Sequence, residues 1–193
     1  MAVAGTSERI VRAALPLFAV HGWSGTSMDE VRRAAGVSNG SLYHHFRSRA
    51  GLAAALLVDG MAAAQQAARD ALRQTESAEQ GVRAVVHAQL AWVEESAELA
   101  RLLYADVPDE VLVAAEPQFS QHNRRYVDDV QGWLHARAEQ QALIDVPFGV
   151  AHALWLGPAT EFSRHWLRGR SRLSPTAAAP ALADGAWRSL APT

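Results

Sequence analysis

Short polar side chains are concentrated in one stretch of the sequence, residues 36–46, which reads GVSNGSLYHHF. Within it, Asn39 can form a two-point hydrogen bond with adenine, and Ser41 can bond to several base edges or to a phosphate. Gly40 lies between them and leaves room for the backbone to come close to a base. These residue types and their spacing indicate a surface that recognises nucleic acid.

Larger polar groups follow in the same stretch. Tyr43, His44 and His45 can reach phosphates or the methyl group of thymine. Arg47 and Arg49 come next, and their guanidinium groups can hold the phosphate backbone. Short side chains that suit base edges are thus followed by cationic groups that suit phosphates, and this order predicts contact with double-stranded DNA.

Two helices before this stretch would position it. Residues 6–21 carry apolar side chains at helical spacing, which predicts a first helix with one buried face. Pro16 lies inside this pattern and is expected to bend the helix, because it removes one backbone hydrogen bond. Gly22 is expected to end it.

The second helix is predicted from Ser27 and Glu30, which form a capping-box pattern. Gly36 supplies a tight turn after this helix, and Ser38 caps a third, short helix. Two helices joined by such a turn form a helix-turn-helix, whose second helix enters the major groove of DNA. Its inward-facing residues are expected to be Val37, Leu42 and Phe46.

Charge is unevenly distributed along the 193 residues. Residues 1–50 contain six Arg and three acidic residues, a net charge of +3, whereas residues 51–193 contain twelve Arg and seventeen acidic residues, a net charge of −5. A basic N-terminal region on an acidic body fits a polyanion-binding domain attached to a second domain. The chain has no cysteine, which excludes disulfides and thiolate metal sites and fits a reducing cytoplasm.

The N-terminal pattern as a whole resembles the TetR family of transcriptional regulators. The resemblance covers roughly residues 7–57 and implies a DNA-binding regulator. The matching segments are Ala13–Leu15, Leu17–Phe18, His21–Trp23, Thr26–Met28, Ala34–Ser38 and Gly40–Phe46.

The resemblance also implies which residues contact DNA. Thr26 and Ser27 would contact phosphate ahead of the second helix, and Arg49 stands where the family usually has a Lys that holds the DNA backbone. The recognition-helix positions are Ser38, Asn39, Gly40, Ser41, Tyr43, His44 and His45. Two copies would bind a palindromic operator, with their recognition helices roughly 34–36 Å apart.

The rest of the chain continues with helical periodicity, and no segment alternates with the period of a β-strand. The sequence therefore predicts an all-α protein, with an N-terminal three-helix helix-turn-helix domain in residues 1–50 and a C-terminal helical ligand-binding and dimerisation bundle in residues 51–193. No apolar stretch is long enough to cross a membrane, and no signal-peptide pattern opens the sequence, so we expect a cytoplasmic protein.

Several polar and aromatic residues of the C-terminal region could line a ligand cavity, because pockets in helical bundles are mainly apolar with a few placed polar groups. The expected effector is a small, largely apolar or aromatic molecule. The candidates are His87, Trp92, Tyr104, His122, Tyr126, Trp133, His152 and Trp155. For each aromatic residue, a place in the hydrophobic core is the alternative.

The last two long helices, predicted at about residues 146–169 and 175–190, are expected to pair with those of a second copy. The resemblance implies a four-helix dimer interface there, and these helices are unusually apolar for a free surface. The candidate contacts are Leu154, Leu156, Gly157, Pro158, Phe162, Trp166 and Trp187. The alternative for each is the core of its own chain.

Two patterns that could suggest an enzyme or a metal site have simpler explanations. Gly36–Gly40 matches the G-x-S-x-G nucleophile elbow, but that motif follows a strand, and residues 31–35 are predicted to be helical. The histidines lack the spacing with acidic residues that a metal-binding helix shows, so no metal or cofactor is predicted. The favoured hypothesis is a ligand-responsive repressor. The alternatives are an activator, or a helical small-molecule-binding protein or enzyme with no DNA-regulatory role.

Overall fold

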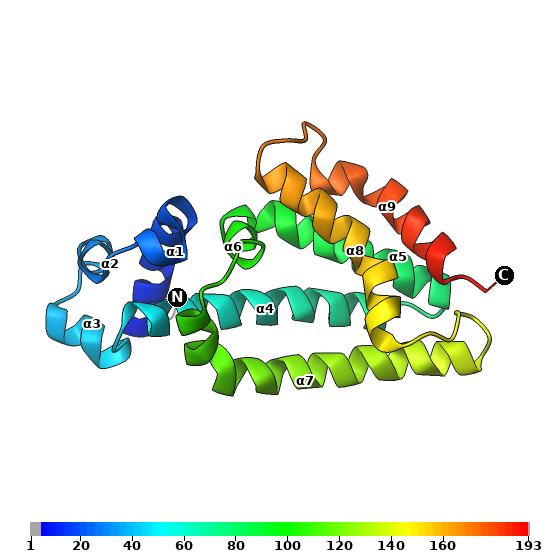
Figure 1. The fold of residues 1–193 in the computed structure, drawn as a ribbon, viewed down its shortest axis with the longest axis horizontal. Helices are drawn as coiled ribbons and strands as arrows, with labels where there is room; N and C mark the ends of the chain where they lie inside the picture. The colour runs from blue at the N-terminus through cyan, green and yellow to red at the C-terminus, as the bar shows by residue number, and fades with distance from the viewer. Residues whose placement is uncertain (1–4, 193) are drawn as a thin grey trace. The chain divides into compact units, whose positions relative to one another are not determined.

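The computed structural model describes residues 5–192, which form nine α-helices and no β-strand (Figure 1). The helices are α1 (Thr6–Gly25), α2 (Met28–Ala35), α3 (Asn39–His45), α4 (Arg49–Arg73), α5 (Ala78–Glu95), α6 (Ala97–Leu103), α7 (Asp109–Glu139), α8 (Phe148–Leu167) and α9 (Pro175–Leu190). The all-α prediction is therefore confirmed. None of the helices in residues 5–192 combines the length and the apolar character needed to cross a membrane.

The helices form two compact units. The first contains the described residues up to Met61 together with Glu98–Gln121, and the second contains Ala62–Ala97 together with the described residues from His122 onwards. The long helices α4 and α7 contribute residues to both units. The sequence analysis expected two domains with a single boundary near residue 50. Each observed unit instead consists of two separate segments of the chain, because α4 and α7 each begin in the first unit and end in the second. Residues 1–4 and 193 of the expected domains lie outside the described residues.

One face of α1 is buried in the core of the first unit. Ile10, Ala14 and Phe18 are fully buried, at the helical spacing that the sequence predicts. The backbone of α1 leaves helical dihedral angles at Gly22, where φ is 73°, and it keeps them around Pro16. The break in the helix is therefore at the glycine, which can adopt a positive φ without a steric penalty.

The second helix has the predicted cap at each end. The Ser27 hydroxyl oxygen accepts a hydrogen bond from the Glu30 amide at 3.2 Å, and the Glu30 carboxylate accepts one from the Ser27 amide at 2.9 Å. The Ser27 amide and hydroxyl lower the pKa of the Glu30 carboxyl. At the other end Gly36 adopts the left-handed conformation, with a φ of 62°. This turn brings α3 back onto the core of the unit, where Val37 is buried.

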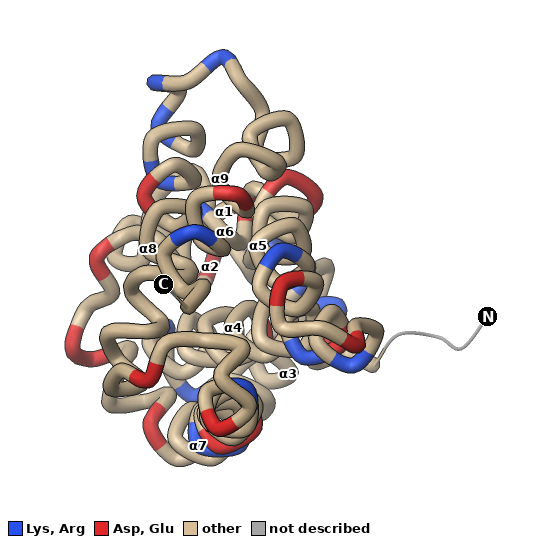
Figure 2. The backbone as a smooth tube through the Cα atoms, turned by 90° about the vertical axis from the view of Figure 1, so that its right-hand side faces the viewer, with Lys and Arg blue, Asp and Glu red and all other residues tan. Residues whose placement is uncertain are grey.

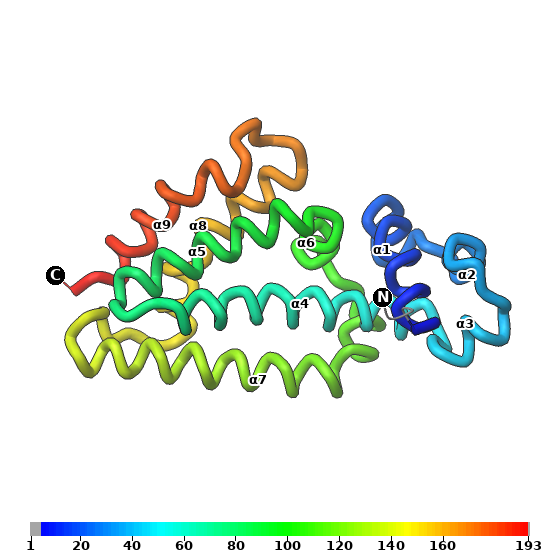
Figure 3. The backbone as a smooth tube through the Cα atoms, turned by 180° about the vertical axis from the view of Figure 1, so that it is seen from behind, coloured from blue at the N-terminus to red at the C-terminus, as the bar shows by residue number. Residues whose placement is uncertain are grey.

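In the second unit, α5, α8 and α9 pack against one another (Figures 1 and 3). The indole Nε1 of the buried Trp155, on α8, donates to the carbonyl oxygen of Val82 on α5 at 2.8 Å. The Trp155 ring also stacks on Trp133 of α7, with ring centroids 5.6 Å apart. The start of α9 is tied to α5, because the Glu94 carboxylate accepts a hydrogen bond from the Thr176 amide at 2.9 Å. Directional hydrogen bonds thus fix which helices lie together.

Basic residues also gather on the second unit. The connection between α8 and α9 contains the exposed Arg168, Arg170 and Arg172. Figure 2 shows basic residues along this connection at the top of the view. The second unit therefore has a local basic surface, although residues 51–193 have a negative net charge.

Candidate nucleic-acid interface

The seven-residue helix α3 exposes one polar face. Ser38 caps the helix, since its hydroxyl oxygen accepts a hydrogen bond from the Ser41 amide at 3.1 Å. Leu42 is fully buried and Phe46 is half-buried, as predicted, so these two residues fix how α3 is rotated about its axis. The opposite face is free for a ligand, and it includes Tyr43, which is 46% exposed.

Most of the residues predicted to contact DNA lie on this exposed face. Ser38, Asn39, Gly40, Tyr43, His44 and His45 are exposed, and Ser41 is half-buried. The rings of His44 and His45 meet edge to face, with centroids 5.2 Å apart. Hydroxyl, amide and imidazole groups are therefore gathered on one short helix, where they can both donate and accept hydrogen bonds.

The two residues predicted to contact phosphate ahead of α2 are in different environments. Ser27 is exposed, and its hydroxyl donates to the Glu30 carboxylate at 2.8 Å. Thr26 is only 2% exposed, and its hydroxyl lies 3.5 Å from the carbonyl oxygen of Gly22. The Thr26 side chain therefore packs inside the unit, and little of its surface remains for a phosphate.

The arginines near α3 differ in their partners. Arg49 forms an ion pair with Glu110 of α7, in which Nη2 lies 2.8 Å from Oε1. Arg32 is paired with Asp29 on α2 at 2.8 Å, and this interaction is the main cause of the lowered pKa of Asp29. Arg47 is exposed, and no residue in the described range 5–192 forms an ion pair with it. Arg47 is thus the arginine whose charge is least compensated beside the polar face.

The G-x-S-x-G pattern at Gly36–Gly40 is not a nucleophile elbow. The segment before it is the helix α2, whereas that motif follows a strand. The Ser38 hydroxyl accepts the capping hydrogen bond of α3. Its role here is to begin a helix.

Comparison with known proteins agrees with this geometry. Residues 10–56, which contain most of α1, all of α2 and α3 and the beginning of α4, match the model of bacterial regulatory proteins of the tetR family. The N-terminal part of the chain is therefore similar to the tetR family. The matched segment contains the helix-turn-helix formed by α2 and α3.

One curated relative and two solved structures illustrate the likeness to known proteins. The HTH-type transcriptional activator FasR of Mycolicibacterium smegmatis is 34% identical over 109 residues, which are 56% of this chain and 50% of FasR, so the chain spans about half the length of that relative. The transcriptional regulator FadR from Bacillus subtilis, solved in complex with stearoyl-CoA, is 14% identical with a TM-score of 0.79 over 94% of this chain and 97% of that one. AibR, solved with isovaleryl coenzyme A and operator DNA, is 19% identical with a TM-score of 0.71 over 97% of this chain and 99% of that one. At these identities the two structures show that the fold is shared.

The residues predicted to bind a ligand do not gather around one cavity. Tyr126 and Trp155 belong to the buried core of the second unit, and Trp133 packs against that core. Trp92 is also buried, whereas His87 and His122 are exposed. Tyr104 belongs to the first unit. Aromatic residues have the same periodicity in a core and in a pocket wall, so the sequence pattern could not separate the two environments.

Two of the predicted ligand residues have a shifted pKa: burial raises the pKa of Tyr126, and the other residue is His152. It is half-buried on α8, and its ring lies 5.8 Å from that of Phe148. Burial lowers the pKa of His152 below its ordinary value of 6.5. The neutral imidazole is therefore favoured in the folded protein.

Two polar pairs inside the second unit were missed by the sequence analysis. The buried Gln65 donates from Nε2 to Oδ1 of Asn123 at 3.1 Å, which links α4 and α7. Gln89 donates to the Thr160 hydroxyl at 2.9 Å, which links α5 and α8. Polar groups among apolar helices are the kind that orient a bound molecule. The sequence does contain a signal that Gln65 is a buried polar residue, because Gln65 interrupts the apolar stripe of α4.

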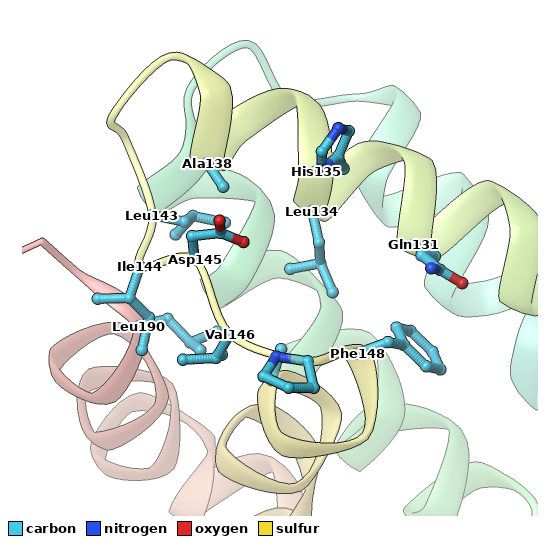
Figure 4. Close-up of a pocket in the computed structure, with 12 residues that line it drawn as sticks. Gln131, Leu134, His135, Ala138, Leu143, Ile144, Asp145, Val146, Phe148 and Leu190 are labelled. Atoms are coloured by element: carbon cyan, nitrogen blue, oxygen red, sulfur yellow. The ribbon is translucent and has the colours of Figure 1, made fainter.

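The second unit has surface clefts of two sizes. The larger has a volume of about 410 Å³ and lies where the end of α7, the start of α8 and the end of α9 meet (Figure 4). The smaller has a volume of about 240 Å³ and is lined by Arg69, Leu72, Arg73, Asp129 and Trp133. Of the predicted ligand residues, Trp133 lines the smaller cleft, and none lines the larger.

One face of α8 is apolar and exposed. Val150 is 48% exposed and Leu154 is 37% exposed, and the exposed Gly157 and Pro158 continue this α8 stripe. The other predicted dimer residues Phe162, Trp166 and Trp187 are half-buried. Leu156 differs from the prediction, because it is buried in the core of its own chain. Its position on α8 turns it inward, away from the stripe.

Proposed function

We propose that this protein is a ligand-responsive transcriptional repressor, which binds a palindromic operator as a homodimer and is released by a small, largely apolar or aromatic effector. The DNA-binding region is residues 1–50, and the effector-binding and dimerisation region is residues 51–193. The observation that carries the proposal is the exposed polar face of α3, which the buried Leu42 holds in place within a TetR helix-turn-helix.

The polar face divides into groups for bases and groups for the backbone. Asn39 and Ser41 lie at the start of α3, the end of a recognition helix that reaches base edges. Tyr43 and His44 lie farther along and suit phosphates or thymine methyl groups. The uncompensated Arg47 supplies a cation for the DNA backbone.

The α8 stripe supports the homodimer. A two-fold interface places the same surface patch of each copy against the other, so an exposed apolar face of one helix can bury itself against its own copy. Such a face is formed by Val150, Leu154, Gly157 and Pro158. The small residues Gly157 and Pro158 allow the two copies of α8 to approach closely. Pairing of this stripe would join two recognition helices into one operator-binding unit.

Acyl-CoA thioesters are the first effector class to test. FadR and AibR share this fold and were solved with stearoyl-CoA and isovaleryl coenzyme A. An acyl-CoA joins an apolar chain to phosphates and an adenine base. The smaller cleft offers the guanidinium groups of Arg69 and Arg73 beside the Trp133 indole, a combination that suits phosphates and a planar base.

Fluorescence anisotropy with DNA from the region upstream of the protein's own gene tests the DNA-binding role. Wild-type protein is expected to bind this DNA with a steep salt dependence, because phosphate contacts release counterions. Tyr43→Ala should weaken binding about tenfold through loss of a recognition-helix contact. Tyr43→Phe is the matched control, since it removes only the hydroxyl. An unchanged affinity of Tyr43→Ala would contradict the assignment of α3.

The effector is tested in the same assay. Stearoyl-CoA and isovaleryl coenzyme A are added to the preformed complex, with free coenzyme A as the control. We expect an acyl-CoA to release the wild-type protein from DNA. The Arg69→Gln, Arg73→Gln double variant should remain bound to DNA when the thioester is added. If the complex persists with every thioester, acyl-CoA is excluded as the effector class. The DNA-binding proposal is not affected by that result.

A further inference from the structure

The larger cleft (Figure 4) shares no lining residue with the smaller cleft or with the α8 stripe. Its volume of about 410 Å³ is in the range of small-molecule sites, roughly 300–1,000 Å³. Most of the residues that line it are apolar, including Leu134 and Ala138 from α7, Leu143 and Val146 from the α7–α8 connection, Phe148 from α8 and Leu190 from α9. The wall also contains Gln131, His135 and Asp145.

Asp145 is the only acidic residue among the described residues that line this wall. No Arg lines the cleft, and Asp145 forms no ion pair with any residue in the range 5–192. His135 could supply a cation, but its Nε2 lies 3.4 Å from the Glu139 carboxylate on its own helix. Figure 4 shows the Asp145 carboxylate turned toward α7, on the side of Leu134.

Helix ends add to the negative potential of the cleft. α7 ends at Glu139 and α9 ends at Leu190, so both bring the negative ends of their dipoles to this place. The Ile144 amide donates to the Leu190 carbonyl oxygen at 2.9 Å, which ties the α7–α8 connection to the end of α9. α8 begins here with its positive end, at Phe148. The Asp145 carboxylate and the two negative helix ends outweigh the positive end of α8, so the electrostatic potential of the cleft is negative.

We propose that this cleft binds a small lipophilic cation. Its apolar body fills the space against Leu134 and Phe148, and its ammonium group pairs with the Asp145 carboxylate. The side-chain oxygen of Gln131 is a further acceptor for the ammonium hydrogens, and the Phe148 ring face attracts a cation. The site lies outside the smaller cleft, so this inference does not depend on acyl-CoA being the effector.

Isothermal titration calorimetry on the full chain tests the proposal with three probes that share one phenylbutyl body and differ in charge: phenylbutylammonium, phenylbutanol and phenylvalerate. Wild-type protein should bind the ammonium about fivefold more tightly than the alcohol, as one partly exposed charge pair predicts, and should bind the carboxylate least. Asp145→Asn should remove the preference for the ammonium while keeping the affinity for the alcohol.

Two further variants locate the site. Asp128→Asn neutralises an exposed carboxylate elsewhere on α7 and should keep the preference for the ammonium. Ala138→Phe fills part of the cleft and should weaken binding of all three probes, with circular dichroism to verify its fold. The Ile144 amide resonance should shift when the ammonium binds to the wild type. The proposal would be overturned by any of three results. The wild type could bind the three probes equally, Asp145→Asn could keep the preference for the ammonium, or the ammonium could fail to bind at millimolar concentration.

Discussion

The Glu110 carboxylate holds the guanidinium group of Arg49, with Oε1 and Nη2 2.8 Å apart. Arg49 is the first residue of α4, which is separated by three residues from the end of α3 at His45, and Glu110 lies in the first turn of α7. Both side chains are partly exposed, so the pair lies at the surface of the first unit. The resemblance to the TetR family implies that the same guanidinium group holds the DNA backbone. Glu110 is therefore a competitor of the phosphate for Arg49.

Glu110→Gln is expected to raise the affinity for operator DNA about threefold, because a surface ion pair of up to about 1 kcal/mol no longer competes. Arg49→Ala should weaken binding and reduce the slope of log K against log salt by about one. Anisotropy titrations at several salt concentrations measure both effects. Asp109→Asn removes the same charge one residue earlier and is the control. If Glu110→Gln behaves like this control, the pair does not oppose DNA binding.

Asn39→Ala is expected to cost about 1–3 kcal/mol in binding to the operator, because alanine cannot make the two-point hydrogen bond with adenine. Binding to unrelated DNA should change little, since the phosphate contacts remain. Competition titrations with operator and unrelated duplexes measure the ratio. An equal loss on both duplexes would assign Asn39 to the DNA backbone instead of a base.

Leu154→Glu is expected to convert the dimer to a monomer at micromolar concentration. In a two-fold interface the introduced carboxylate approaches its own copy in an apolar surrounding, where both charges lose hydration. Analytical ultracentrifugation measures the change. Val113→Glu is the control, because Val113 is 75% exposed and belongs to the first unit. A Leu154→Glu protein that dimerises as tightly as the control would exclude the α8 stripe as the interface.

His152 makes the free energy of unfolding depend on pH. Burial lowers its pKa from 6.5 in the folded protein, so the unfolded chain takes up a proton at a higher pH than the folded chain does. The contribution of neutral His152 is therefore complete above about pH 6.5 and is lost as the pH falls toward the lower folded-state pKa.

The comparison with His152→Gln isolates this effect, because glutamine does not titrate. Urea denaturation at a series of pH values between about 7.5 and 5.5 should show wild type losing stability relative to the variant as the pH falls. A stability difference that stays constant over this range would show that His152 is not the group responsible.

Local signals in the sequence predicted the first unit in detail. Ser27 with Glu30, Gly36 and Ser38 act within a few residues of their own positions, through capping bonds and a positive φ. Their effect depends little on the rest of the chain, so the caps and the turn follow from residue type and spacing. The inward positions of Leu42 and Phe46 can be predicted in the same way, since α3 can turn only one face to the core.

What the sequence by itself determined is the helical class, the helix-turn-helix and the residues on its exposed face. Only the tertiary structure decided that Thr26 and Leu156 point inward, that Arg49 meets Glu110, and that Trp133 and Trp155 stack in a core. It also decided that Asp145, which forms no ion pair within residues 5–192, lies in a cleft made by three helix ends. The physical reason is that these outcomes depend on contacts between residues far apart in the chain. Helical periodicity states which side of a helix is buried, but not which helix will cover it.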